Sequence, residues 1–271
     1  MRIIYSTIVG SKMHGLDTPA SDEDIRYITM HPIRHVLSPF KNETIKVRDS
    51  SGDDVESWEL CHFVKHLTSG NPTCYEVVRS DLNDKSAKYS ETNRFIKSLM
   101  PLSYDGVKIL MAHCGYAEAQ LSRYLRKASA DMAFYKTNVL LDTKKLPSHK
   151  EFNEHTQYTW DYDAIRRIPK SVVAGYRVLA QGEQLLRTGD FITRIKDYSP
   201  ELHDKLMGIK MMDARDITWE FVEEHLNGIE SGIKALKAVY ETLDDKAKYS
   251  KPDIDGIEEI LCDLYGVSNA Q

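Results

Sequence analysis

Two aspartates one residue apart, Asp22 and Asp24, follow a glycine–serine pair at Gly10 and Ser11. In an extended chain, side chains two residues apart point to the same face, so the two carboxylates converge and Glu23 points away. Converging carboxylates repel each other unless a cation lies between them or one of them is protonated. Hard oxygen ligands with open coordination positions suit Mg²⁺ or Mn²⁺. Gly10 lets the backbone approach a phosphate and Ser11 offers a hydroxyl and an N–H, so the pattern predicts a metal–phosphate site.

The segments on either side of this pattern predict two strands. Residues 2–9 form a β-branched run that stops at Gly10, which predicts a buried strand that leads into a loop. Residues 24–30 alternate between two faces, which predicts a second strand. For Asp22 and Asp24 alone, an acidic turn that caps a strand would be the simpler interpretation. The Gly-Ser loop that joins the two strands favours the metal–phosphate site instead.

The rest of the first hundred residues predicts two more strands and two helices. The strand candidates are residues 44–48 and 54–60, with a turn between them that is rich in turn-forming residues. Apolar residues at helical spacing then predict a helix over 60–67. Asn71 is a natural N-cap, and Pro72 suits the first position of the next helix.

From about residue 103 the apolar pattern is helical throughout. The clearest stripe, at alternating spacings of three and four, consists of Trp219, Val222, Leu226, Ile229, Ile233, Leu236, Tyr240 and Leu243. This stripe is typical of a long amphipathic helix in a bundle; a coiled-coil seam, and with it a homodimer through the helical part, is the alternative. The change of pattern near residues 98–104 predicts two domains, residues 1–100 and residues 101–271.

The composition limits the compartment and the partners. The 271 residues carry a formal net charge of -5, which argues against a protein that coats nucleic acid by bulk charge. The four cysteines are scattered and fit reduced thiols, and adjacent pairs such as Cys61-His62 cannot close on one zinc ion. The sequence has neither a secretory signal nor an apolar run of about 18 residues. We therefore expect a soluble cytoplasmic protein without a membrane partner.

The segment with Gly10-Ser11 and Asp22-x-Asp24 resembles the signature of the polymerase-β-like nucleotidyltransferase superfamily. It looks closest to the nucleotidyltransferases associated with RNA repair, whose pattern runs Gly-Ser-basic, then Gly, then Pro-x-Ser-Asp-x-Asp-x-Arg. Further matches, in order, are Asp54, Trp58-Glu59-Leu60, Asn71-Pro72, Glu76, Ser80, Gly115-Tyr116-Ala117, Gln120, Lys170, Arg177, Glu183-Gln184-Leu185-Leu186 and Lys251-Pro252-Asp253. The resemblance implies an α/β (α+β) fold, in which a small mixed-sheet catalytic domain is followed by an all-α helical domain.

The resemblance also implies a two-metal site for attack on a phosphoryl group. In such a site Asp22 and Asp24 would bind two Mg²⁺ or Mn²⁺ ions, and Asp54 would be the third carboxylate ligand. Glu56, two residues on and on the same strand face as Asp54, is the fallback ligand. Glu76 is a second fallback; for it, a first-turn glutamate favoured by the helix dipole is an equally good interpretation.

The residues that the resemblance assigns to the nucleotide and its phosphates are Gly10, Ser11, Lys12, Arg26, Lys170 and Arg177. Lys170 and Arg177 lie seven apart on a predicted helix, so they share a face that could clamp a phosphate; a solvated basic face is the alternative. For Arg26 the alternative is an ion pair with a nearby acid. One departure from the family is Ala174, which stands where a histidine is usual.

The leading hypothesis is a metal-dependent enzyme that transfers a nucleotidyl group from a nucleoside triphosphate to a hydroxyl acceptor. The acidic chain offers no obvious basic groove, so a small molecule or water is favoured over nucleic acid as the acceptor. With water, the same site would hydrolyse a nucleoside 5'-monophosphate, an activity that some phage enzymes of nucleotide metabolism have. A non-catalytic nucleotide sensor is the third hypothesis.

Overall fold

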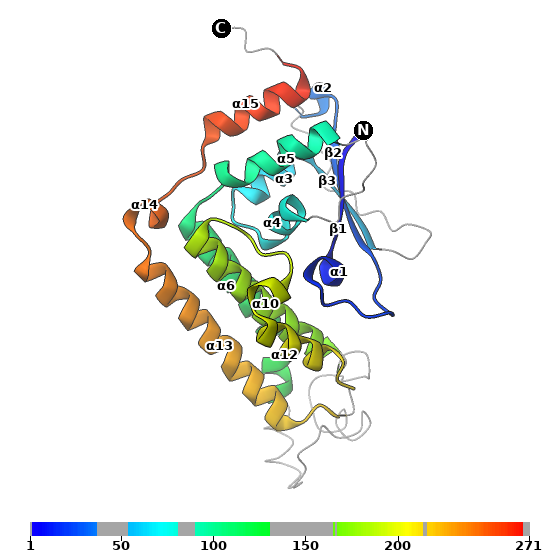
Figure 1. The fold of residues 1–271 in the computed structure, drawn as a ribbon, viewed down its shortest axis with the longest axis vertical. Helices are drawn as coiled ribbons and strands as arrows, with labels where there is room; N and C mark the ends of the chain where they lie inside the picture. Colours follow the sequence, from blue (N-terminus) through cyan, green and yellow to red (C-terminus); the bar gives the residue numbers. More distant parts are fainter. Residues whose placement is uncertain are drawn as a thin grey trace.

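The computed structural model describes residues 2–36, 54–80, 90–130, 165, 167–213 and 216–267. The first part of the chain contains β1 (Arg2–Val9), α1 (Gly10–His14), β2 (Asp24–Met30), α2 (Ile33–Val36), β3 (Asp54–Glu59), α3 (Leu60–Leu67), α4 (Pro72–Arg79) and α5 (Ser90–Leu102). The second part contains α6 (Gly106–Gln120), the π-helical segment η2 (Leu121–Leu125), α10 (Arg167–Thr188), α11 (Ile195–Tyr198), α12 (Pro200–Lys210), α13 (Trp219–Thr242), α14 (Asp245–Lys248) and α15 (Ile254–Tyr265). A small sheet followed by helices confirms the predicted α+β fold (Figure 1).

The sheet has three strands in the order β1-β2-β3 and is mixed. Strand β1 pairs with β2 antiparallel, with Val9 opposite Asp24, whereas β2 pairs with β3 parallel, with Asp24 opposite Asp54. The end of β1 and the starts of β2 and β3 therefore lie side by side at the same end of the three strands, which we call the sheet edge. The predicted strands at 2–9, 24–30 and 54–60 are confirmed, and the candidate at 44–48 lies outside the described residues.

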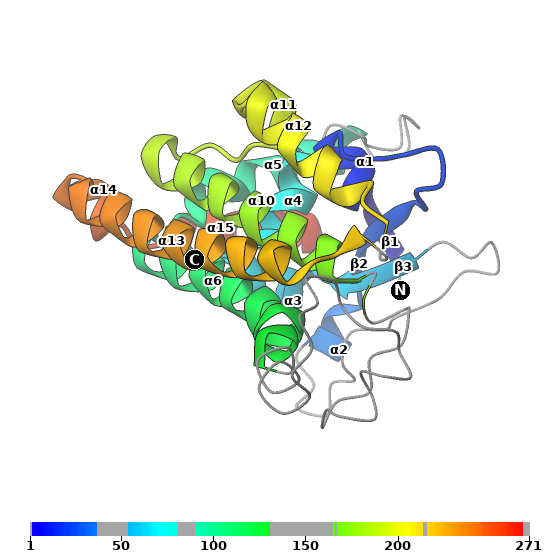
Figure 2. The same cartoon turned by 90° about the horizontal axis from the view of Figure 1, so that it is seen from below.

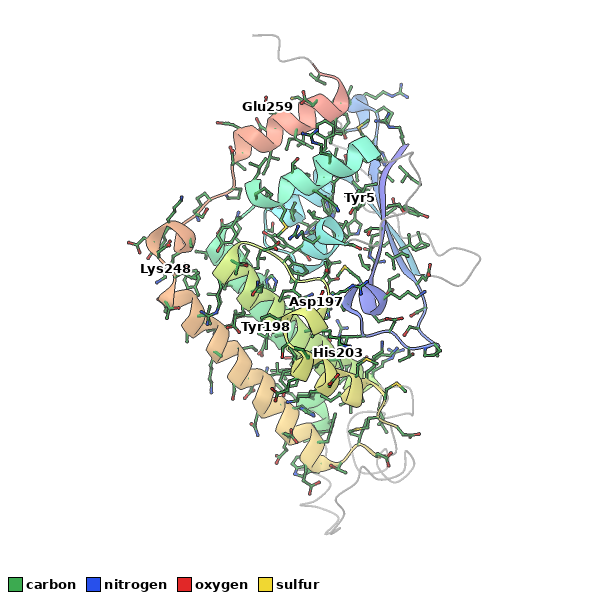
Figure 3. The ribbon with its side chains drawn as sticks, viewed as in Figure 1. Tyr5, Asp197, Tyr198, His203, Lys248 and Glu259 are labelled. Carbon is green, nitrogen blue, oxygen red and sulfur yellow. The ribbon has the colours of Figure 1, made fainter. Side chains whose placement is uncertain are left out.

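Helices α3, α4 and α5 lie beside the sheet (Figure 1). Tyr5, on β1, is fully buried, and its hydroxyl donates a hydrogen bond of 2.8 Å to the carbonyl of Val77 in α4 (Figure 3). The N-cap of α4 is formed as predicted, because the side chain of Asn71 accepts a hydrogen bond from the Thr73 N–H and Pro72 occupies the first turn. These contacts fix α4 against the strand that leads to Gly10.

Helices α6, α10 and α13 pack against one another and form the bundle of the second part (Figure 2). The predicted apolar stripe lies on α13, where Val222, Ile229, Ile233, Leu236 and Tyr240 are buried. Since these side chains contact the core of their own chain, the amphipathic-helix interpretation is confirmed. Within the part of the chain that the structure describes, no helix is both long and apolar enough to cross a membrane.

The two parts share one hydrophobic core, which runs from β1 to α15 without a break. The C-terminal helix α15 returns to pack against α5 (Figure 1). The N–H of Asp253 donates a hydrogen bond of 2.8 Å to the carbonyl of Leu102. The predicted boundary at 98–104 falls at the end of α5 and in the short turn before α6. The division into residues 1–100 and 101–271 stays a prediction.

Candidate functional site

The turn after β1 is built around Gly10, whose φ of 70° lies in the left-handed region that glycine favours. A Cβ atom at this position would lie 2.0 Å from Oδ2 of Asp24, so only glycine leaves room for that carboxylate. The prediction that the chain enters a loop here is wrong, because Gly10–His14 forms the short helix α1. The helix ends at Gly15, with a φ of 65°, whose N–H bonds to the carbonyl of Lys12.

The two aspartates lie at the start of β2, with Asp24 as its first residue and Asp22 two residues before it. Asp54 is the partner of Asp24 in the parallel register, which brings the backbones of these two residues side by side. The side chain of Asp54 lies outside the described residues. In the described ranges of the chain, no cluster of three or more His, Cys, Asp or Glu side chains is arranged to hold a metal ion. The third carboxylate ligand therefore stays a prediction.

The other candidates near the sheet edge form ion pairs. Lys12 Nζ lies 2.5 Å from Glu23 Oε1, so the glutamate between the two aspartates is directed to α1. Arg26 Nε lies 3.3 Å from Glu56 Oε2, on the neighbouring strand. The ion pair that was the alternative for Arg26 is thus present, and it also occupies the fallback ligand Glu56. A phosphate role for Lys12 or Arg26 remains a prediction.

Helix α12 brings two residues to this turn that the sequence did not single out. His203 (Figure 3) donates a hydrogen bond of 2.9 Å from Nε2 to the carbonyl of Gly15. Lys210 Nζ donates one of 2.5 Å to the carbonyl of Leu16. In the sequence, both residues lie about two hundred positions after the turn that they contact. Only the folded contact reveals them, because their spacing carries no motif.

The charge around Lys210 connects α12 to the carboxylates. Partial burial and the nearby charge of Lys170 lower the pKa of Lys210, and the carboxylates of Asp17, Asp22 and Asp24 act in the opposite direction. Lys170 of α10 and the aspartates Asp17, Asp22 and Asp24 thus all lie within electrostatic range of the Lys210 ammonium group. Lys170 is exposed, so its ammonium group is accessible to a ligand at this edge.

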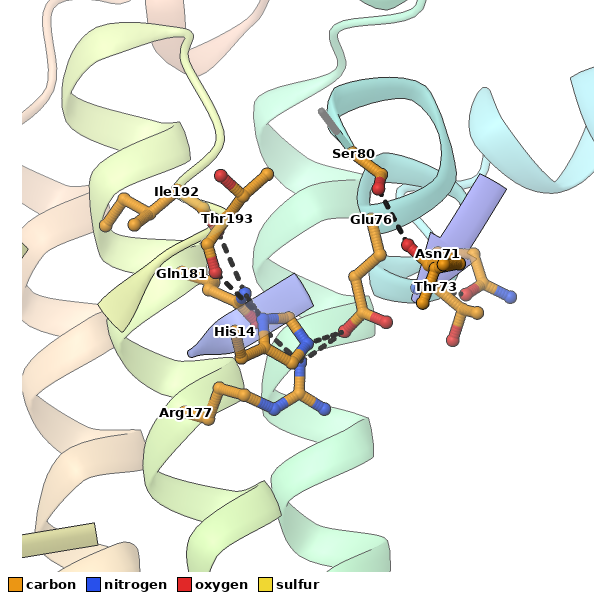
Figure 4. Close-up of polar contacts among 10 residues, drawn as sticks. His14, Asn71, Thr73, Glu76, Ser80, Arg177, Gln181, Ile192 and Thr193 are labelled. Carbon is orange, nitrogen blue, oxygen red and sulfur yellow. Dashed lines mark hydrogen bonds and ion pairs between the residues drawn. The ribbon is translucent and has the colours of Figure 1, made fainter. Parts of the chain in front are cut away.

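Behind the turn, a buried polar cluster joins the two parts of the molecule: His14 of α1, Glu76 of α4, and Arg177 and Gln181 of α10 (Figure 4). Arg177 Nη1 forms an ion pair with Glu76 Oε1 and donates hydrogen bonds to Gln181 Oε1 at 3.0 Å and to His14 Nε2 at 2.7 Å. His14 Nδ1 lies 3.0 Å from the carbonyl of Thr193. We assign the proton to Nδ1, because Nε2 then accepts from Arg177.

The cluster holds its charges in fixed states. Burial acts to raise the pKa of Glu76, but the charge of Arg177 outweighs it and holds that pKa far below its usual range. Burial and the neighbouring Arg177 lower the pKa of His14, despite the opposing charge of Glu76. The cluster therefore consists of a carboxylate, a guanidinium and a neutral imidazole at pH 7.

The buried cluster also bears on three of the predicted site residues, Lys170, Arg177 and Glu76. Lys170 and Arg177 both lie on α10, as predicted, but Lys170 is exposed and Arg177 is engaged in the buried cluster. The structure therefore does not bring the two together as a pair, and the phosphate clamp stays a prediction. Glu76 lies in the second turn of α4, so the first-turn interpretation is wrong: Pro72 begins the helix and no acidic residue falls in its first turn.

Comparison with protein families decides what this arrangement belongs to. The family model described as RlaP, RNA repair pathway DNA polymerase beta family, matches residues 1–171. The chain belongs to this RlaP family. The match covers the sheet, the Gly10 turn and both Asp22 and Asp24, and extends into the start of α10. The resemblance to the polymerase-β-like superfamily is thereby confirmed, and a nucleotidyltransferase-like enzyme is the class that the family indicates.

A relative of this RlaP-family chain is an uncharacterized 38.9 kDa protein in the nrdC-mobD intergenic region of Enterobacteria phage T4. The two sequences are 28% identical over 145 residues, which are 48% of this chain and 40% of the phage protein. The chain thus matches less than half of the length of that relative.

Proposed function

We propose that the chain is a metal-dependent nucleotidyltransferase, which transfers a nucleotidyl group from a nucleoside triphosphate to a hydroxyl acceptor. The acceptor oxygen would form a bond to the α-phosphorus, the bond from that phosphorus to the bridging oxygen would break, and pyrophosphate would leave. The observation that carries the proposal is the packing of Asp24 against the Cα of Gly10, where a side chain would displace the carboxylate.

The carboxylates of Asp22 and Asp24 are hard oxygen donors, and they fit a divalent cation such as Mg²⁺ or Mn²⁺. Gly10 supports this fit, since the bare backbone leaves the carboxylate of Asp24 room at the sheet edge. Two bound ions would supply charge stabilisation and activation of the attacking oxygen. Asp54, adjacent in the parallel register, is our first choice for the third ligand, with Glu56 and Glu76 as fallbacks.

The chain's own residues would bind and orient the phosphates. Ser11, at the start of α1, offers its hydroxyl and N–H to the terminal phosphates. Lys170 and Lys210 would supply positive charge from the helical side. His203, which holds the carbonyl of Gly15, would keep the turn in place while the substrate binds.

The acceptor is the open part of the proposal. With a net charge of -5 for the chain, we favour a small hydroxyl compound or water over a polymer. If water is the acceptor and a nucleoside 5'-monophosphate the substrate, the products are a nucleoside and orthophosphate. The product therefore separates the two reactions.

The test is an assay of the purified protein with Mg²⁺ or Mn²⁺. One panel contains nucleoside triphosphates, with and without small hydroxyl compounds and oligonucleotides, and is assayed for pyrophosphate. The other contains nucleoside and deoxynucleoside monophosphates and is assayed for orthophosphate. Pyrophosphate from triphosphates supports the proposal, whereas orthophosphate from monophosphates alone replaces it with a nucleotidase.

Two variants test the site. Asp22→Asn and Asp24→Asn should each lose activity by about 100-fold or more, because each removes a charge from the phosphoryl-transfer site. Glu23→Gln is the matched control: it removes a charge between the two aspartates, but Glu23 is directed to Lys12. Activity that survives both aspartate substitutions would show that the carboxylates of β2 are not the site.

A further inference from the structure

Helix α3 carries two histidines, His62 and His66, that have no part in the proposed transfer reaction. They are four residues apart, so their side chains lie on one face of the helix. His62 is exposed and His66 is partly exposed, whereas the opposite face of α3 is buried through Leu60, Phe63 and Leu67. The pair therefore lies on the outside of the molecule, on a helix that the core holds firmly.

The two imidazole rings face each other with their Nε2 atoms. Nε2 of His62 and Nε2 of His66 are 3.0 Å apart, and the rings meet edge to face with their centroids at 4.4 Å. Two nitrogens at about 2.05 Å from one ion would be about 2.9 Å apart at a right angle and about 3.3 Å apart at the tetrahedral angle. The observed separation lies inside this range.

The ring of His66 packs beside an aromatic neighbour, and the start of the helix that carries both histidines is capped. The ring of Trp58 lies 6.1 Å from that of His66, centroid to centroid, and limits how far it can turn. The backbone N–H of His62 donates a hydrogen bond of 3.0 Å to Oε2 of Glu59, which is the N-cap of the helix. Tyr265 donates to the other oxygen of Glu59 at 3.1 Å, so that carboxylate is already occupied.

The chemistry of the pair favours borderline metal ions. A neutral imidazole binds a metal ion through the lone pair of a ring nitrogen, and here two such nitrogens face each other. Imidazole nitrogen suits Zn²⁺, Ni²⁺ and Cu²⁺, whereas Mg²⁺ and Mn²⁺ prefer oxygen ligands. The pair is thus selective against the ions that suit the carboxylates of β2.

We propose that His62 and His66 form a second metal site, which binds one Zn²⁺, Ni²⁺ or Cu²⁺ ion through the two Nε2 atoms and leaves its other positions to water or an external ligand. In the absence of metal the two nitrogens share one hydrogen. When the ion binds, that hydrogen moves to Nδ1 of the same ring, so no proton needs to be released. The site is independent of the proposed transferase activity.

Equilibrium dialysis with Cu²⁺, Ni²⁺ and Zn²⁺ in excess Mg²⁺ tests the proposal, because Mg²⁺ saturates oxygen sites and leaves imidazole sites free. We expect one ion per chain, with affinity in the order Cu²⁺ > Ni²⁺ > Zn²⁺. His62→Gln and His66→Gln should each weaken binding by about 100-fold, because the remaining imidazole loses the advantage of a second linked ligand. His31→Gln, outside α3, is the matched control and should bind as the unchanged protein does.

Thermal unfolding gives a second readout that needs no enzyme activity. Ni²⁺ should raise the Tm of the unchanged protein and of His31→Gln, but not that of either α3 variant, since only a bound ion stabilises the folded state. Binding that persists in His62→Gln and His66→Gln, or the absence of any Ni²⁺ binding up to millimolar concentration, would overturn the proposal.

Discussion

Replacement of Gly10 by alanine tests the central geometric argument, and Gly15 supplies a matched control. Both glycines have positive φ, 70° and 65°, so alanine is strained to a similar extent at either position. They differ in space: a Cβ at Gly10 lies 2.0 Å from Oδ2 of Asp24, whereas a Cβ at Gly15 has nothing within 4 Å. Gly10→Ala therefore adds a collision with the carboxylate to a strain that both variants share.

The magnitudes follow from these numbers. The left-handed backbone costs an L-residue about 1–2 kcal/mol, so Gly15→Ala should lose about that much free energy of unfolding, and Gly10→Ala should lose at least as much. An ordinary contact begins at 3.4 Å, which means that the carboxylate of Asp24 must move by about 1.4 Å in Gly10→Ala. A misplacement of about 1 Å at a reacting centre can cost about 100-fold in rate. We expect a loss of that size for Gly10→Ala and only a few-fold loss for Gly15→Ala.

The assay combines urea unfolding with the product assays described above, at a temperature where both variants are folded. A much larger loss of activity in Gly10→Ala than in Gly15→Ala, with both variants folded, would support the role of Gly10 as a spacer for Asp24. Gly10→Ala with unchanged kcat would refute the reasoning. So would a Gly15→Ala variant that is as inactive as Gly10→Ala, because strain of the turn alone would then explain the loss.

Three further predictions concern other parts of the molecule. Arg177→Met leaves the carboxylate of Glu76 buried and unpaired, so urea unfolding should report a loss of about 3–5 kcal/mol in the free energy of unfolding. The double variant Arg177→Met with Glu76→Gln should lose less than the sum of the two single losses, because the two residues interact. Burial lowers the pKa of His113 to about 4, so between pH 4 and about 6.5 the unfolded chain binds more protons at this residue than the folded protein does. The free energy of unfolding therefore falls as the pH drops below about 6.5. The unchanged protein should lose about 2 kcal/mol more than His113→Asn between pH 7 and pH 5, and equal losses would contradict the shift. Lys210→Gln should weaken the binding of a nucleoside triphosphate about tenfold, as measured by calorimetry, whereas Lys205→Gln on the same helix, whose ammonium lies 4.7 Å from the Tyr176 ring centroid, should not.

Local sequence patterns predicted the elements that carry the candidate site. Strand β2 was predictable with its bounds, because alternation and the preceding aspartates leave little choice, and the cap at Asn71 follows from side-chain chemistry alone. The short helix α1 was not predictable, since glycine and serine favour a turn in isolation. The helix forms here because Gly15 can end it in the left-handed conformation and its N–H bonds back to Lys12.

Long-range contacts were beyond the reach of the sequence. Arg177 was assigned to a phosphate from its position on a helix, but the structure surrounds it with Glu76 and His14, which come from opposite ends of the first eighty residues. Lys210 was not considered, because no spacing links it to Asp24. Such contacts depend on how the helices pack against the sheet, which periodicity does not specify.

The ion pair between Glu76 and Arg177 makes the two parts of the molecule dependent on each other. A fragment that ends near residue 100 would keep Glu76 but lose Arg177, and would also leave the face of α5 that α15 covers in contact with water. In that fragment the carboxylate of Glu76 would have to be hydrated or protonated. Either change would loosen the packing of α4 against β1. The sheet with the aspartates is therefore unsuited to transfer into another protein by itself, and recombination that exchanges one part without the other should yield insoluble chains.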